Sequence, residues 1–244
     1  MRLVQVTDCH LHADPAARSR MGVPHRQLHA VLDRARSLRP DLLLVTGDIS
    51  EDESPASYRH AAEAFSALEC PWFWLPGNHD RPRYMAEERE LLDEVDLGEW
   101  RLLMLDSHVN GQAHGELGQV QLQALALALE EDDRPTLLAL HHPPVEVGSA
   151  WMDAIGLTDR EAFWQTLAAY AQVRAILFGH IHQAFTARHA SAQGEIVIYG
   201  CPATADQFLA GSPEFAIDEA SRPGLRVVDL DASGIHTWIE RIDS

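Results

Sequence analysis

Five short apolar segments of this chain are each followed directly by side chains that can bind metal ions. We expect the segments 3–7, 42–46, 72–75, 136–140 and 175–178 to form buried β-strands, because apolar runs of this length bounded by polar turns are typical of strands. The polar segments that follow them are Asp8-Cys9-His10, Gly47-Asp48, Gly77-Asn78-His79-Asp80, His141-His142 and Gly179-His180-Ile181-His182. Open α/β sheets bind ligands outside the carboxyl ends of their strands, so this pattern predicts one shared site at a single sheet edge.

Helical periodicity alternates with these strands along most of the chain. Helices are predicted near 25–38, 56–68, 83–93, 118–130 and 159–171, and further strands at 102–105, 195–199, 225–230 and 235–241. The last two strands form a hairpin through residues 231–234. Alternating strands and helices, followed by a β-rich part from about residue 195 to 244, predict one layered α/β domain with mixed sheets over residues 1–244.

The charge balance excludes several classes of function. The formal net charge is −18 and all 19 basic residues are arginines, which excludes Schiff-base, PLP-lysine and P-loop chemistry. A nucleic-acid polymer or a membrane surface is not expected as a partner, because both are bound through basic surfaces. The chain has no run of about 18 apolar residues, so no membrane span is expected either.

The cysteines and the N-terminal residues bear on the compartment. Cys9, Cys70 and Cys201 are widely spaced and form no C-x-x-C pair, which indicates neither a disulfide framework nor a thiolate zinc site and fits a reducing compartment. The N-terminal segment turns polar at Thr7, so no apolar core of a signal peptide is expected there. We therefore expect a cytoplasmic protein, in which Cys9 is a small packing residue.

The donor types narrow the choice of metal. In an extended chain, residues i and i+2 face the same way, so each of the pairs Asp8-x-His10 and His180-x-His182 is expected to present two ligands to one cavity. Carboxylate, imidazole and amide oxygen donors favour manganese, iron, zinc or cobalt over a soft-metal site. The candidate ligands are too many for one four-coordinate zinc and suit two ions bridged by a carboxylate. They are Asp8, His10, Asp48, Asn78, His141, His180 and His182.

Each motif also has a purely structural interpretation. Asn and Gly are common turn residues, and a histidine at a strand end can simply be hydrogen-bonded. Five such motifs at five strand ends in order favour a metal site instead. The other histidines that we interpret as surface or core residues are His12, His25, His29, His60, His114, His189 and His236.

The order of the motifs, D-x-H, G-D, G-N-H-D, H-H-P-P and G-H-x-H from Asp8 to His182, is similar to that of the calcineurin-like metallophosphoesterase superfamily. The resemblance implies a four-layer α/β/β/α sandwich with two central mixed β-sheets. It also implies two transition-metal ions, iron and manganese, with zinc or cobalt as alternatives. By this resemblance Asp8, His10 and His182 bind the first ion, Asp48 bridges, Asn78, His141 and His180 bind the second, and His142 lies outside the ligand set.

The same resemblance implies a hydrolytic mechanism. A hydroxide that bridges the two ions would attack phosphorus, while His79 stabilises charge or protonates the leaving oxygen and Asp80 orients His79. Asn78, His79 and His182 would contact the substrate phosphate. No ligand and no candidate acid is missing from the motifs, which disfavours a scaffold that has kept the fold and lost catalysis.

A finer resemblance, to the class III cyclic-nucleotide phosphodiesterases, covers nearly the whole chain. It is carried by segments 115–117, 148–157, 179–183, 207–208 and 223–226. It implies hydrolysis of 3′,5′-cyclic AMP to 5′-AMP, and it leaves a homodimer open. Glycerophosphodiesters or a broad range of small phosphodiesters are the alternative substrates, whereas a repair nuclease is disfavoured by the negative charge. Trp151 either stacks on the purine or packs within its own loop.

Overall fold

The computed structural model describes residues 1–191 and 193–243, in which eleven strands form two β-sheets. The five-stranded sheet contains β1 (Arg2–Val6), β2 (Leu42–Thr46), β3 (Trp72–Leu75), β10 (Gly224–Asp231) and β11 (Gly234–Arg241), in the order β11-β10-β1-β2-β3. The six-stranded sheet contains β4 (Glu94–Leu97), β5 (Trp100–Met104), β6 (Thr136–Ala139), β7 (Val173–Phe178), β8 (Phe185–Ser191) and β9 (Gly194–Gly200), in the order β4-β5-β6-β7-β9-β8.

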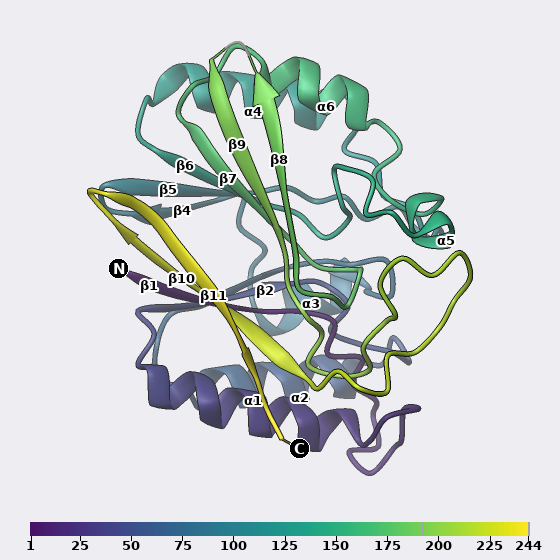
Figure 1. Cartoon of the computed structure of the whole chain (residues 1–244). Coiled ribbons are helices and arrows are strands. Elements are labelled where there is room, and N and C mark those ends of the chain that lie inside the picture. Colours follow the sequence, from purple (N-terminus) through teal and green to yellow (C-terminus); the bar gives the residue numbers. More distant parts are fainter. Residues whose placement is uncertain (192, 244) are drawn as a thin grey trace.

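Helices cover the outer face of each sheet (Figure 1). The helices α1 (Pro24–Leu38), α2 (Pro55–Ser66) and α3 (Pro82–Glu88) follow strands of the five-stranded sheet, and α4 (Gly118–Glu131), α5 (Ala150–Asp153) and α6 (Arg160–Leu167) follow strands of the six-stranded sheet. The layers run from α1 and α2, through the two sheets, to α4 and α6. This arrangement confirms the four-layer sandwich with two mixed sheets.

The strand β2 shows how the apolar runs build these layers. Its residues are buried on both faces of the sheet, as expected for a strand with parallel neighbours on both sides. Leu42 and Leu44 belong to the apolar cluster between the two sheets, whereas Leu43 and Val45 belong to the cluster beneath α1 and α2. Successive side chains of a strand alternate between faces, so one continuous apolar run supplies two cores.

The topology brings the strand ends together. Strands β1, β2 and β3 are mutually parallel, as are β5, β6, β7 and β9. Every predicted metal-binding segment follows the carboxyl end of one of these parallel strands. β10 pairs antiparallel with β1, so the C-terminal hairpin completes the five-stranded sheet on the far side of β1 from β2.

Several element boundaries differ from the sequence-based expectation. The helix expected over 83–93 ends at Glu88, because the following residues extend into β4, which pairs with β5. The helix expected over 159–171 ends at Leu167, and the strand expected to begin at residue 102 already begins at Trp100. The edge strands β4 and β8 and the one-turn helix α5 were not expected. The nine strands that were expected are all present.

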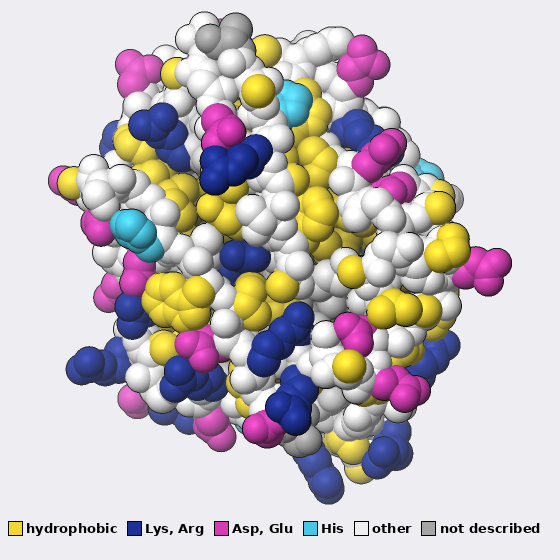
Figure 2. Space-filling model, in the orientation of Figure 1, with side chains coloured by type: hydrophobic (Ala, Val, Ile, Leu, Met, Phe, Trp, Pro, Cys, Tyr) yellow, Lys and Arg dark blue, Asp and Glu magenta, His cyan; other side chains and the backbone are white. Residues whose placement is uncertain are grey.

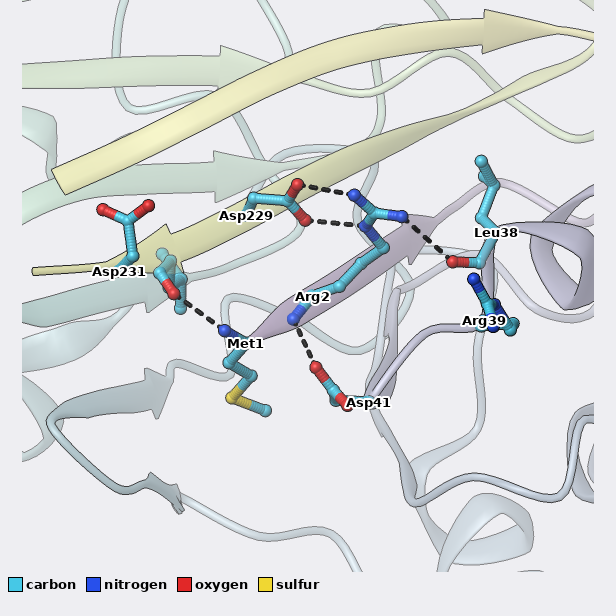
Figure 3. A pocket seen from close by; sticks show the side chains of 8 residues that line it. Met1, Arg2, Leu38, Arg39, Asp41, Asp229 and Asp231 are labelled. Atoms are coloured by element: carbon cyan, nitrogen blue, oxygen red, sulfur yellow. Dashed lines mark hydrogen bonds and ion pairs between the residues drawn. The ribbon is translucent and has the colours of Figure 1, made fainter. Parts of the chain in front are cut away.

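A hollow of about 510 Å³ lies at the amino ends of β1 and β2, away from the predicted site (Figure 3). There the guanidinium of Arg2 donates two hydrogen bonds to Asp229, each 2.7 Å long, and the backbone N–H of Arg2 donates to Asp41. These bonds tie the start of the chain to β10 and to the segment before β2. We interpret the hollow as the place where a structural ion pair, Arg2 with Asp229, joins β1 to β10.

On the face seen in Figure 2, arginine side chains are interspersed with acidic and apolar ones instead of forming a basic stripe. No helix within residues 1–191 and 193–243 is both long enough and apolar enough to cross a membrane.

The cluster between the sheets should dominate stability. Leu44 is fully buried there, so Leu44→Ala leaves a cavity and is expected to lower the free energy of unfolding by about 2–5 kcal/mol. Leu127→Ala on α4 is the matched control, because Leu127 is 60% exposed and should change stability by less than about 0.5 kcal/mol. Urea unfolding of both variants measures the difference. Equal losses would contradict the assignment of the inter-sheet core.

Candidate metal centre

The loop after β1 continues the parallel pairing of β1 and β2 beyond the end of the sheet. The backbone N–H of Asp8 donates to the carbonyl of Gly47, and that of His10 donates to the carbonyl of Asp48, both at 3.0 Å. A Cβ on Gly77 would collide with the Asp48 carboxylate, so the loop after β3 approaches this pair closely only because residue 77 is glycine. Three loops of the first sheet are thereby packed against one another.

The second sheet is joined to these loops by direct hydrogen bonds. Within the second sheet, the backbone N–H of Gly179 donates to the carbonyl of His141 at 3.1 Å and holds the loops after β6 and β7 together. The backbone N–H of His180 donates to the carboxylate of Asp8 at 3.0 Å. A Cβ on Gly179 would strike the side chain of Thr7, so this crossing between the sheets also requires glycine. The carboxyl edges of both sheets therefore meet at one place.

Five of the predicted ligands adopt left-handed backbone conformations. The φ angle is 53° at Asp8, 46° at His10, 50° at Asp48, 66° at His180 and 53° at His182. The extended backbone expected for the D-x-H and H-x-H segments is therefore wrong. Non-glycine residues in this region cost about 1–3 kcal/mol each and cluster at functional sites, where the surrounding structure holds them.

Three of these side chains form the first cluster of donors. Asp8, His10 and His182 each bring one donor atom to within 4.8 Å of the others. His182 Nε2 lies 3.3 Å from Asp8 Oδ1 and 3.2 Å from His10 Nε2. Asp48 Oδ2 lies 3.8 Å from His10 Nε2, at the inner side of this cluster.

The second cluster surrounds the ring of His141. Its Nε2 atom lies 3.2 Å from Asn78 Oδ1, 3.3 Å from His180 Nδ1 and 3.4 Å from Asp48 Oδ2. Asp48 therefore faces both clusters, which is the position that a bridging carboxylate requires. The neighbouring His142 is also within reach of this cluster, but its Nδ1 is engaged with the hydroxyl of Ser107 at 2.8 Å.

The outer nitrogens of three histidines are fixed by acceptors outside the clusters. His10 Nδ1 donates to the Glu51 carboxylate at 2.7 Å, and His182 Nδ1 donates to the carbonyl of Asp206 at 2.6 Å. His141 Nδ1 donates to the carbonyl of Thr46 at 2.7 Å. Metal-binding histidines are usually held in this way, with the other ring nitrogen left free for the ion.

These hydrogen bonds make it possible to test whether the residues fit metal ions. With both Nδ1 atoms used as donors, the facing Nε2 atoms of neutral His10 and His182 would carry lone pairs only 3.2 Å apart. The nitrogens of His141 and His180 meet at 3.3 Å in the second cluster. A proton or a metal cation must lie between the members of each pair. The residues therefore fit two cations, one for each cluster.

The pKa values of the metal-free protein follow the same logic. Burial works against charge on His10, but its hydrogen bond to Glu51 and the nearby Asp48 raise its pKa to about 9. Burial likewise opposes charge on His141, and the anionic Asp48 raises its pKa to about 9. Burial and the adjacent charge of His141 lower the pKa of His180 to about 3. One member of the His141–His180 pair thus holds the proton and the other stays neutral.

Both buried carboxylates of the clusters are anionic at neutral pH. Burial opposes their charge, but His182 lowers the pKa of Asp8, and His141 holds the pKa of Asp48 well below its usual range. Two divalent ions together with these two anions would leave the site with about two positive charges. That charge suits the binding of an anionic phosphate ester in an acidic protein.

His79 and Asp80 have different surroundings. The side chain of His79 is 41% exposed, and its Nδ1 lies 3.5 Å from the Glu51 carboxylate. Asp80 is buried and accepts hydrogen bonds from the backbone N–H groups of Ile49 and Gly77, which joins the loops after β2 and β3. Burial and the charge of Asp48 raise the pKa of Asp80 to about 7. Asp80 thus contacts the loop that carries His79, and Glu51 faces the imidazole ring.

The clusters open into a pocket of about 610 Å³. Its lining includes the cluster residues His10 and His182 with His79, and beside them Arg18, Arg20, Phe208 and Phe215. The half-buried ring of Trp151 packs edge-to-face against Phe208 and Phe215, each with ring centres 5.3 Å apart. Trp151 therefore lies behind these two phenylalanines, and its contact with a base stays a prediction.

Sequence reasoning did not identify Glu51, Asp206, Phe215 or the two arginines of the pocket. Glu51 could have been suspected, because it is three residues beyond Asp48 in the same loop. The others lie in loops without a chemical motif, and only the fold brings them to the clusters. Cys9 is fully buried, and burial raises the pKa of its thiol, in agreement with a packing role.

A layered α/β sandwich with this donor cluster defines the class of metal-dependent phosphoesterases. Comparison with known proteins agrees: residues 1–184 match the family described as calcineurin-like phosphoesterase. The chain belongs to this family.

Relatives and solved structures extend the comparison. A protein from Vibrio vulnificus named 3′,5′-cyclic adenosine monophosphate phosphodiesterase CpdA is 39% identical to this chain, and the alignment covers 100% of this chain and 91% of the relative. A protein of the same name from Pseudomonas aeruginosa is 38% identical, and the alignment covers 99% of this chain and 90% of the relative. A dimetal phosphatase from Danio rerio has the same fold, with a TM-score of 0.69 at 14% identity and 99% of each chain covered. A purple acid phosphatase from yellow lupin has a TM-score of 0.63 at 13% identity, with 98% of this chain and 51% of that chain covered.

Metal binding should release protons. His10 and His141 have pKa values of about 9 in the metal-free protein, so they are protonated at pH 7.5 and must lose these protons to become ligands. Loading of two manganese ions should therefore release about two protons at pH 7.5, and affinity should rise with pH up to about 9. Calorimetric titration of the chelator-treated protein in buffers with different ionisation enthalpies measures the release. An affinity that does not change between pH 7 and 9 would contradict this electrostatic description.

Proposed function

We propose that this protein is a phosphodiesterase that uses two metal ions to hydrolyse 3′,5′-cyclic AMP to 5′-AMP. The observation that carries the proposal is that relatives aligned over almost the whole chain bear the name of this activity. The pocket supports it, because residues of the donor clusters and aromatic rings line it together, and bound metal ions would make its cluster end cationic. A cyclic nucleotide has the same two parts, an anionic phosphodiester and a flat base.

The residues divide into metal-binding and substrate-binding groups. We assign the first ion to Asp8, His10 and His182, the bridge to Asp48, and the second ion to Asn78, His141 and His180. Imidazole and carboxylate donors without thiolate suit iron and manganese, and also zinc or cobalt. When bound, the ions would supply Lewis-acid activation of water and of the phosphoryl group.

His79 has the geometry of a general acid in this pocket. Its backbone N–H donates to Asp48 at 2.9 Å, which fixes the start of the side chain next to the clusters. Its ring lies edge-on to His10, with centres 5.0 Å apart, and remains open to the pocket. Water adds to phosphorus and loses one proton to the solvent, the bond from phosphorus to the 3′-oxygen breaks, and His79 gives a proton to that oxygen and takes one back from the solvent. The phosphate then stays on the 5′ side of the ribose.

Glu51 and Asp80 position this acid. Burial opposes the negative charge of Glu51, but its hydrogen bond to His10 and the charge of that ring lower its pKa. Glu51 therefore faces Nδ1 of His79 as an anion. A carboxylate there favours a proton on that ring nitrogen. Asp80 holds the backbone between Gly77 and His79 against the loop after β2. We propose that the protein acts in the cytoplasm, and a homodimer stays a prediction.

Substitution of Asp48 should lower the metal content, whereas substitution of His79 should lower turnover. Asp48→Ala removes the carboxylate shared by both clusters, so the purified protein should lose metal. His79→Ala should keep both metals and lose about 10²- to 10⁴-fold in kcat, the usual range for general acid–base catalysis. Elemental analysis together with initial rates checks both variants. A His79→Ala protein that has lost one metal would show that His79 is itself a ligand.

The substrate assignment is tested on one preparation of the wild-type protein. We expect chelation to abolish hydrolysis and manganese to restore it, and kcat/KM for cyclic AMP to exceed that for glycerophosphoethanolamine. The two substrates share the phosphodiester, but cyclic AMP carries it in a ring on ribose with a base, whereas glycerophosphoethanolamine carries it in an open chain without sugar or base. A tenfold or greater preference for the glycerol ester would replace cyclic AMP by glycerophosphodiesters. Full activity in excess chelator would overturn the metal-dependent mechanism itself.

A further inference from the structure

The pocket beside the metal clusters contains more than hydrolysis of a phosphodiester requires. Two phenylalanines and two arginines line it, in a chain whose net charge is −18. One face of the Phe208 ring is stacked on the ring of His182, with centres 3.8 Å apart and planes 10° apart. That face is therefore not free to bind a ligand. Phe208 thus packs against a metal-site histidine and links it to the next aromatic ring.

Phe215 is the exposed phenylalanine of this pocket. It is 44% exposed, and its ring centre lies 5.3 Å from that of Phe208. Trp151 supports both phenylalanines from behind, and the hydroxyl of Ser149 donates to the carbonyl of Ser212 at 2.5 Å, which fixes the loop that carries Phe215. Phe215 thus continues the aromatic surface of Phe208 into the pocket, and contiguous apolar surface rimmed by polar residues is typical of a ligand-binding groove.

Arg20 is placed against Phe215 by the same structure that holds the metal-site histidine. The guanidinium carbon of Arg20 lies 4.6 Å from the centre of the Phe215 ring. The carboxylate of Asp206 accepts hydrogen bonds from the hydroxyl of Ser19 at 2.6 Å and from the backbone N–H of Arg20 at 3.1 Å. The carbonyl of Asp206 accepts from His182 Nδ1 at 2.6 Å. The arginine loop is therefore fixed relative to the first metal cluster.

We propose that Phe215 and Arg20 form a nucleobase-binding wall, which selects nucleotide esters over phosphodiesters that lack a base. This inference rests on the proposed function and specifies its substrate side. Two ring-to-ring contacts of 3.8 and 5.3 Å lead from His182 to Phe215, the scale on which a ribose separates a phosphate from its base. The base packs against the exposed surface of Phe215, and the N–H groups of Arg20 reach acceptor nitrogens at the edge of the base. Phe215, and not Trp151, then presents the aromatic surface.

The test isolates the contribution of the base. 5′-AMP and ribose 5-phosphate share the sugar and the phosphate, so the ratio of their inhibition constants against turnover of bis(p-nitrophenyl) phosphate measures base binding. We expect 5′-AMP to bind the wild-type protein about tenfold more tightly, within the usual range for stacking of one base on an aromatic side chain. Phe215→Leu and Arg20→Met should each bring the ratio toward one and raise KM for cyclic AMP, with kcat preserved.

Matched controls separate this role from a general loss of structure. Trp238→Leu removes another exposed aromatic ring with an arginine against it, and Arg26→Met removes another exposed arginine, but neither residue lines the pocket. Both control variants should keep the wild-type ratio. Arg20→Met leaves the loop in place, since Asp206 binds the backbone N–H of residue 20 and not its side chain. Unchanged metal content and an unchanged midpoint of urea unfolding verify that the variants are folded.

The outcomes keep this inference distinct from the proposed function. A wild-type ratio near one, or a preserved ratio in Phe215→Leu and Arg20→Met, overturns the wall even if cyclic AMP is hydrolysed. A high wild-type ratio that both variants lose supports the wall even if cyclic AMP is a poor substrate, in which case another nucleotide ester takes its place. Failure of cyclic AMP hydrolysis alone therefore counts against the proposed function only.

Discussion

The centre of this molecule depends on imidazole nitrogens that are held close to one another. His10 and His182 approach to 3.2 Å, and His141 and His180 approach to 3.3 Å. Such pairs persist only because their rings are anchored from outside, and the anchors for His141 and His182 are backbone carbonyls. Carbonyl positions are set by strands and their loops, so the stacking of the two sheets determines the spacing of the donors. The left-handed residues show that the fold also bears local backbone strain to keep this spacing.

Much of this arrangement could be predicted from the sequence, because the informative features are local. A buried strand such as 42–46 is visible as an apolar run, and the side chain that follows it is the one that reaches the sheet edge. The rule that ligands bind at the carboxyl ends of parallel strands then brings distant motifs together without further information. The order of the layers followed from the family resemblance, not from the periodicity.

Features that depend on partners elsewhere in the chain could not be predicted. The strands β4 and β8 are edge strands whose exposed and less exposed residues alternate, and they are defined by pairing with β5 and β9 more than by their own composition. Left-handed φ angles at aspartate and histidine leave no trace in the sequence, unlike those at glycine. The carbonyl anchors are equally invisible, because a backbone carbonyl has no side-chain identity. Asp206 is an example, since its carbonyl and its carboxylate both act at the site.

Asp206 bonds through both its backbone carbonyl and its carboxylate, and this has an evolutionary consequence. One residue fixes the ring of His182 through its backbone carbonyl and fixes the Ser19–Met21 segment through its carboxylate. A substitution at Asp206 removes the carboxylate and leaves the carbonyl, so it would release the Ser19–Met21 segment while the anchor of His182 stays in place. Substitutions of side chains that only project from this segment, such as Arg20, would leave both attachments intact. The wall of the pocket can therefore change by substitution, whereas the anchor of His182 belongs to the backbone and is kept.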